Sequence, residues 1–182
     1  MNFSQFLKAE GQTLIKNKGE HIFMQGDIDR SLYIVQQGLI KAYYISEDGK
    51  ESVKSFLMPE NIIGSLASAF SKEACTFSLI CLEPSTLVKV PFDVLQEHST
   101  RNHEFALQLN ETLLHFAMKK EKREFELLCL SAEARFAALV EKSPSLLKRV
   151  TQNDIARYLG VTPVGLSRIK KRVLENNKNH KV

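Results

Sequence analysis

The stretch from residue 92 to residue 130 contains neither glycine nor proline, so nothing in its composition interrupts a long helix. Apolar side chains recur in it at steps of four, four and three residues, the spacing of one helical face. These side chains are Phe105, Leu109, Leu113 and Phe116. The charged run at residues 119–124 is interpreted as a solvated face of the same helix. The sequence therefore predicts a long amphipathic helix here, with an early break near Ser99-Thr100 left open.

The residues before this stretch have a different sequence pattern, because turn signals interrupt them at short intervals. Asp48-Gly49 is the sharpest signal, since both residues tolerate the positive φ of a tight hairpin. Between the turns lie short segments rich in aromatic and branched residues, at 21–24, 32–36, 39–45, 53–57, 77–82 and 86–90. Short strands at such spacing predict an antiparallel sandwich or barrel. We interpret it as a β-roll.

The last third of the chain carries the start and stop signals of shorter helices. Ser131 opens one helix by a capping signature, and this helix runs to about Lys142. Thr151 opens another, because Asp154 follows at the third helical position and completes a capping box. Gly160 suits the left-handed residue that closes it.

A further helix is predicted directly after this glycine. Thr162 suits its N-cap and Pro163 its first helical position. Leu166, Ile169 and Val173 follow at steps of three and four and form a single buried stripe. Two short helices joined by a glycine-containing turn are a helix-turn-helix unit.

The buried stripe fixes which residues point outward, at about 100° per residue. Arginine and lysine on an outward helical face can contact the O6 and N7 atoms of guanine in a DNA major groove, and helix N-termini can hold phosphates. The candidate DNA-binding residues are Thr151, Gln152, Thr162, Val164, Ser167, Arg168, Lys171 and Arg172. The alternative is an ordinary pair of helices with basic surface residues.

The charge distribution favours the first interpretation. Residues 1–147 carry 16 basic and 19 acidic residues, whereas residues 148–182 carry 9 and 2, giving net charges of −3 and +7. A basic end on a mildly acidic body indicates a polyanion-binding segment. A solvated tail accounts only for the last few residues, because seven of the nine basic residues lie at or before Arg172.

Other classes of protein are disfavoured. The longest apolar run is the five residues 136–140, far short of the roughly 20 that a membrane helix needs. Three cysteines (Cys75, Cys81 and Cys129) form neither a disulfide framework nor a Cys-x-x-Cys pair, and no secretory signal is visible, so we expect a cytoplasmic protein. The histidines are scattered, which disfavours a metal-dependent β-roll enzyme. We therefore expect no catalytic site, no metal and no cofactor.

Residues 151–170 resemble the DNA-binding helices of the Crp/Fnr (cAMP receptor protein) family, in particular the branch with a Thr-Pro-x-x-Leu-Ser-Arg-Ile pattern. The first half is similar to the family's cyclic-nucleotide-binding β-roll at Gly19-Glu20, residues 25–27, residues 32–35, Gly38 and residues 48–51. The resemblance implies an α+β protein of three parts. These are a β-roll effector domain (1–91), a long dimerisation helix (92–130) and a winged helix-turn-helix domain (131–182).

The resemblance also implies roles for two sets of residues. The long helix would pair two copies through Phe105, Leu109, Leu113 and Phe116, the alternative being that this stripe packs only on its own β-roll. The family's nucleotide pocket, built on Gly-Glu-Leu and Arg-Ser/Thr-Ala, corresponds here to Gly64-Ser65-Leu66 and Cys75-Thr76-Phe77. Both charged groups are missing, and a buried phosphate without a cation loses its strongest contacts.

We therefore expect no useful binding of cAMP or cGMP, and leave open another effector or none. Oxidation of Cys75 is a further hypothesis, against the more common inert buried thiol. The function expected is that of a dimeric transcription regulator, with the helix at 162–173 in the major groove of a near-palindromic site. The alternative is an effector-binding or protein-interaction module that keeps the two helices as scaffold. Candidate partners are double-stranded DNA, a second copy, RNA polymerase and an unidentified small-molecule effector.

Overall fold

The structure, a computed structural model, describes residues 3–179. The ends of the first and last predicted domains, residues 1–2 and 180–182, lie outside the described residues. The backbone divides into two units, Met1–Phe116 and Ala117–Val182, and the helix α4 (His103–Cys129) enters both. Within the described part of the chain, no helix is long and apolar enough to cross a membrane.

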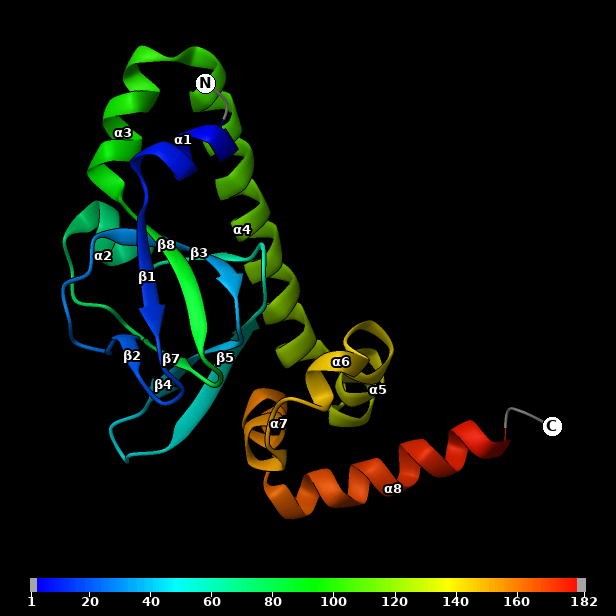
Figure 1. The fold of residues 1–182 in the computed structure, drawn as a ribbon. Coiled ribbons are helices and arrows are strands. Elements are labelled where there is room, and N and C mark those ends of the chain that lie inside the picture. Colours follow the sequence, from blue (N-terminus) through cyan, green and yellow to red (C-terminus); the bar gives the residue numbers. More distant parts are fainter. Residues whose placement is uncertain (1–2, 180–182) are drawn as a thin grey trace. The chain divides into compact units, whose positions relative to one another are not determined.

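Two four-stranded antiparallel sheets form the body of the first unit (Figure 1). One sheet has the order β1 (Gln12–Lys16), β8 (Ser85–Pro91), β3 (Ser31–Gln37), β6 (Ile62–Ile63). The other has the order β2 (His21–Phe23), β7 (Ser78–Cys81), β4 (Ile40–Ile45), β5 (Glu51–Leu57). The predicted β-roll is confirmed, and each predicted segment is a strand. Strands β1 and β6 were not predicted, because β1 is largely exposed and β6 has only two residues.

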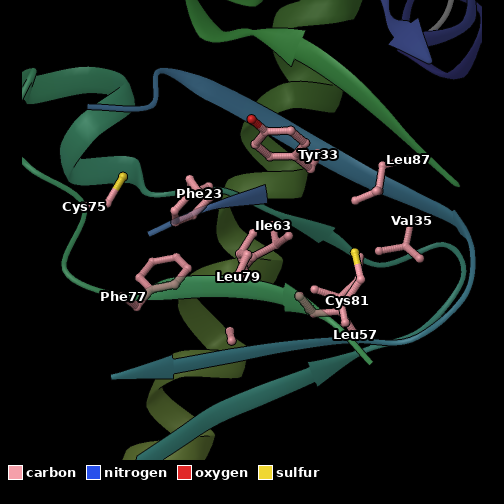
Figure 2. Close-up of a cluster of buried hydrophobic side chains, with 12 residues drawn as sticks. Phe23, Tyr33, Val35, Leu57, Ile63, Cys75, Phe77, Leu79, Cys81 and Leu87 are labelled. Carbon is pink, nitrogen blue, oxygen red and sulfur yellow. The ribbon is translucent and has the colours of Figure 1, made fainter. Parts of the chain in front are cut away.

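The interior between the sheets is filled by large apolar side chains (Figure 2). Phe23 and Phe77 meet edge to face with 5.3 Å between ring centroids, and both are at most 5% exposed. Tyr33 is buried as well, and its hydroxyl donates to Asp29 Oδ2 at 2.8 Å. Burial and this carboxylate raise the pKa of Tyr33 far above its ordinary value. The interior of the β-roll is therefore filled by the protein's own side chains, with the aromatic rings among them.

The early break that the sequence left open is present, so the predicted long helix consists of two helices. Helix α3 (Phe92–Arg101) ends at Asn102, whose backbone is extended with φ −136° and ψ 105°. The Asn102 side chain then accepts a hydrogen bond from Phe105 N at 3.0 Å, near the start of α4. A residue in the β region cannot continue a helix, and its side-chain oxygen caps the next one. The break lies two residues after the position that the sequence left open.

The apolar stripe predicted to join two copies is largely used within the first unit, in line with the alternative that it packs on its own β-roll. Phe105 and Leu109 are buried at 0% and 7% exposure. Phe105 packs against Phe6 of α1 (Phe3–Glu10) and His98 of α3, with ring centroids 4.7 and 4.6 Å apart. Leu113 is partly buried against the same cluster. The sequence did not reveal that α1 and α3 cover this face, so its burial was assigned to a partner.

The described residues of the second unit form helices only. After α4 come α5 (Ala132–Lys142), α6 (Pro144–Leu147), α7 (Gln152–Leu159) and α8 (Pro163–Asn179). Ser131 caps α5 as predicted, accepting from Ala134 N at 3.1 Å. The expected wing is wrong for this part of the chain: between Pro91 and residue 179 there is no strand. Residues 144–147 instead form the unpredicted helix α6, because Pro144 suits a first helical turn.

Candidate nucleic-acid interface

Helix α7 begins at the predicted N-cap Thr151, whose side chain exchanges two hydrogen bonds with Asp154. Asp154 N donates to Thr151 Oγ1 at 3.1 Å, and the Thr151 hydroxyl donates to Asp154 Oδ2 at 2.7 Å. Asp154 is only 6% exposed, and the Thr151 hydroxyl is a donor to its buried carboxylate. The cap therefore sets where α7 starts and holds a buried charge in place.

The turn between α7 and α8 depends on one left-handed residue. Gly160 has φ 69° and ψ 32°, a conformation open to glycine at no steric cost. Val161 N then donates back to Ala156 O at 3.0 Å, which closes α7. Thr162 Oγ1 accepts from Gly165 N at 3.1 Å and starts α8. Both predicted caps and the predicted turn are confirmed.

The two faces of α8 differ sharply in burial, as the stripe predicts. Leu166 and Ile169 are 1% and 5% exposed and pack with α7 in the second unit. Val164, by contrast, is 62% exposed, and Ser167, Arg168 and Lys171 are exposed as well. Among the side chains that the structure describes, no carboxylate pairs with Arg168 or Lys171. These two cations are therefore available to an outside anion.

Other predicted DNA-binding residues are engaged inside the unit. Arg172 Nη1 lies 2.8 Å from Glu133 Oε1 on α5. Gln152 Oε1 accepts from Lys170 Nζ at 2.7 Å, a lysine that the sequence did not single out. Arg172 and Lys170 thus lean toward neighbouring helices, while Arg168 and Lys171 extend into solvent.

The six residues of the predicted effector pocket are spread over three environments instead of lining one polar cavity. Ser65 is 2% exposed and caps the short helix α2 (Leu66–Ser71), accepting from Ser68 N at 3.3 Å. Gly64 lies against the backbone of Ser31, where a Cβ would come within 2.6 Å of the Ser31 carbonyl oxygen. Leu66 and Thr76 are exposed.

The remaining two pocket residues belong to the apolar core. Cys75 and Phe77 are 2% and 5% exposed, and Figure 2 shows both among the core side chains. The position that holds a cationic arginine in the family is thus a buried thiol. A phosphate placed at the buried Cys75 would be desolvated and would lack the bidentate contact that an arginine at this position would make.

The buried thiols do not form a disulfide. Cys75 and Cys81 are both free, and Figure 2 shows them at opposite ends of the cluster. Burial raises the pKa of the Cys81 thiol, which keeps it protonated and weakly nucleophilic. Within the described residues there is no group of three or more side chains able to hold a metal ion.

A small cavity lies in the second unit, where the sequence predicted none. Its volume is about 100 Å³, and Arg123, Arg135, Lys142 and Tyr158 are among the residues that line it. Small-molecule sites usually enclose about 300–1,000 Å³, so the cavity is too small for a nucleotide. Arg123 belongs to the run at 119–124 predicted to be solvated, yet it is half-buried against Tyr158. The sequence held no signal for this contact, which joins residues 35 positions apart.

Known proteins are similar to this chain over most of its length. The model of the cyclic nucleotide-binding domain matches residues 16–102. The chain is 29% identical over 163 residues to the regulatory protein HlyX of Actinobacillus pleuropneumoniae, covering 84% of this chain and 67% of HlyX. It is 26% identical over 170 residues to the transcriptional activator protein Anr of Pseudomonas protegens, covering 87% of this chain and 69% of Anr.

Solved structures share the fold at low sequence identity. FixK2 from Bradyrhizobium japonicum superposes with a TM-score of 0.75 at 17% identity, covering 92% of this chain and 86% of FixK2. A mutant of CooA from Carboxydothermus hydrogenoformans gives 0.74 at 16% identity, covering 96% and 81%. The fold of this chain is therefore one that these proteins share.

Proposed function

We propose that this chain, which belongs to the Crp/Fnr family of regulators, binds double-stranded DNA as a homodimer through α8 and thereby regulates transcription. The observation that carries the proposal is the exposed face of α8. Arg168 and Lys171 project from it, while Leu166 and Ile169 bury the opposite face. An α-helix with this distribution fits the B-DNA major groove, which is about 12 Å wide.

The proposed contacts divide into two kinds. Arg168 is the candidate for reading a guanine edge, and the exposed Val164 suits the methyl group of a thymine. Lys171 and the Val164 amide at the N-terminus of α8 suit phosphates, because a helix N-terminus carries a partial positive charge; Pro163 has no N–H, and Gly165 N already donates to Thr162. Phosphate contacts position the protein, whereas base contacts select the sequence.

Dimerisation is assigned to a different face of α4 from the one that the sequence indicated. A stripe of apolar side chains along this helix stays exposed by 56–76%, with steps of seven, four, seven and three residues. Its members are Leu107, Leu114, Met118, Phe125 and Leu128. A heptad-like apolar stripe is the seam through which two helices pair as a coiled coil. We define these five residues as the α4 seam.

The β-roll is proposed to act without a cyclic nucleotide. Its domain family is named for such ligands. Here, however, the positions that correspond to the family's nucleotide pocket include a helix cap, two exposed residues and two core side chains. The packed Phe23–Phe77 pair occupies the interior instead. Another effector, held elsewhere on the chain, is compatible with this structure.

The test is binding of a labelled 30-bp duplex pool at increasing salt, followed by fluorescence anisotropy. Each neutralised phosphate contributes roughly −0.9 to the slope of log affinity against log salt. A dimer with about 6–10 phosphate contacts should give a slope of about −5 to −9. The Arg168→Ala/Lys171→Ala variant should bind more weakly with a shallower slope. Salt-independent binding, or none, would favour the alternative of an effector-binding or protein-interaction module.

A further inference from the structure

Arg123 on α4 holds the last turn of α7. Its guanidinium carbon lies 3.9 Å from the centroid of the Tyr158 ring, and Nη2 donates to the Tyr158 carbonyl. The group thus uses both its flat face and its edge on one residue, which a lysine ammonium cannot do. Burial lowers the pKa of Arg123 from its ordinary value, and the nearby Tyr158 and Glu126 oppose that shift.

Arg135 on α5 joins the same two helices from another side. Its Nη1 donates to the carbonyls of Glu126, Leu127 and Leu130 at 3.3, 3.2 and 2.6 Å. Its Nη2 donates to the carbonyl of Leu159 at 2.9 Å. These carbonyls lie at the C-terminal ends of α4 and α7, where a helix leaves its last acceptors unsatisfied. One guanidinium therefore caps two helix ends at once.

The hydrogen-bond acceptors in these contacts are backbone carbonyl oxygens, so the bonds hold helices and not merely side chains. α8 follows α7 through the tight turn at Gly160, and Leu159 and Leu166 are both buried in the second unit. The C-terminal part of α4, α7 and α8 all belong to that unit. A rotation of this part of α4 would carry α8 with it.

We infer that Arg123 and Arg135 are positioning residues that make the orientation of α8 follow that of α4, and so set the half-site spacing that a dimer accepts. The inference rests on the proposed function, because spacing has meaning only for two copies bound to one duplex. In a two-fold dimer the recognition helices reach half-sites about 34 Å, or about 10 bp, apart. If α8 is held rigidly to the paired α4 helices, the dimer accepts only one distance between half-sites. If α8 is held loosely, the dimer accepts a range of distances.

The experiment compares duplexes that carry the preferred half-sites at the preferred spacing with duplexes in which 2 bp are inserted between them. A dimer that cannot contact both half-sites at once loses the affinity gained from binding the second site intramolecularly, which is about 100-fold or more. Wild type should show this loss, whereas Arg123→Ala and Arg135→Ala should lose less than about tenfold while binding an isolated half-site as wild type does. Arg123→Lys, which keeps the charge without the flat guanidinium, should fall between them. The matched control is Lys142→Ala, which removes an exposed cation beside the same cavity and should keep the wild-type spacing dependence.

The outcomes separate the inference from the proposed function. Arginine variants with the wild-type spacing dependence would overturn the inference alone, whereas failure of wild type to bind any duplex would overturn the proposed function. If Arg135→Ala does not fold, Tyr158→Leu removes the ring on which Arg123 stacks, keeps the backbone carbonyl, and should relax spacing as Arg123→Ala does. Hydrogen exchange on wild type without DNA gives an independent answer. Amides of residues 117–129 and 152–159 should exchange with the same opening free energy. Different opening free energies for the two segments would contradict a rigid connection between α4 and α7.

Discussion

Arg172 on α8 and Glu133 on α5 form an ion pair, with 2.8 Å between Nη1 and Oε1. The pair holds a cation of the proposed recognition helix against its own unit, and both side chains remain partly solvated, at 65% and 39% exposure. Exposed pairs of this kind contribute about 0.2–1 kcal/mol. In the proposed complex, DNA would displace Glu133 from this arginine at a small cost.

Replacement of Glu133 by glutamine should release Arg172 and tighten duplex binding by up to about fivefold at low salt, since the pair no longer has to break. Fluorescence anisotropy measures the change. Glu141→Gln, the matched control, removes an exposed acid of the same helix that lies in its last turn. Equal effects of the two substitutions would mean that only net charge matters and that the pair is irrelevant.

Arg168 and Lys171 should differ in what their loss does. Arg168→Ala should cost about 1–3 kcal/mol and relax selectivity at one base pair in each half-site, because a base contact is removed. Lys171→Ala should weaken binding evenly across sequences and lower the salt slope by about one, because a phosphate contact is removed. Titration of a panel of single-base variants of the operator distinguishes the two. If both variants bind the panel as wild type does, α8 does not dock in this orientation.

Loss of the Thr151 cap of α7 should be detected first as a lower free energy of unfolding. Thr151→Ala removes the acceptor of Asp154 N and a donor to the buried carboxylate, and should lower the free energy of unfolding by about 0.5–2 kcal/mol. Urea unfolding followed by circular dichroism measures it. Thr76→Ala, at an exposed threonine, should stay within about 0.5 kcal/mol of wild type. An unchanged midpoint for Thr151→Ala would show that the cap is dispensable.

Isothermal titration with cAMP and with cGMP should give no binding in the micromolar range. The reason is chemical as well as steric: the arginine position is the buried Cys75, and Phe77 packs into the interior. Saturable micromolar binding of either nucleotide would contradict this account of the β-roll.

The sequence predicted features that depend on neighbouring residues better than those that depend on the fold. The caps at Thr151 and Thr162 and the turn at Gly160 follow from local chemistry and are all present. Phe105 was assigned to a partner because helical spacing reveals a buried face but not what buries it. The contact of Arg123 with Tyr158 had no sequence signal, since a charged run on a helix is the ordinary mark of a solvated face.

The most direct test of the central claim is selection of bound duplexes from a random pool by the intact chain. The account predicts enrichment of a near-palindrome whose half-sites lie about 10 bp apart, centre to centre, and loss of one conserved base pair per half-site when Arg168→Ala is used. A pool that stays random after repeated rounds, or a motif that Arg168→Ala enriches unchanged, would contradict it.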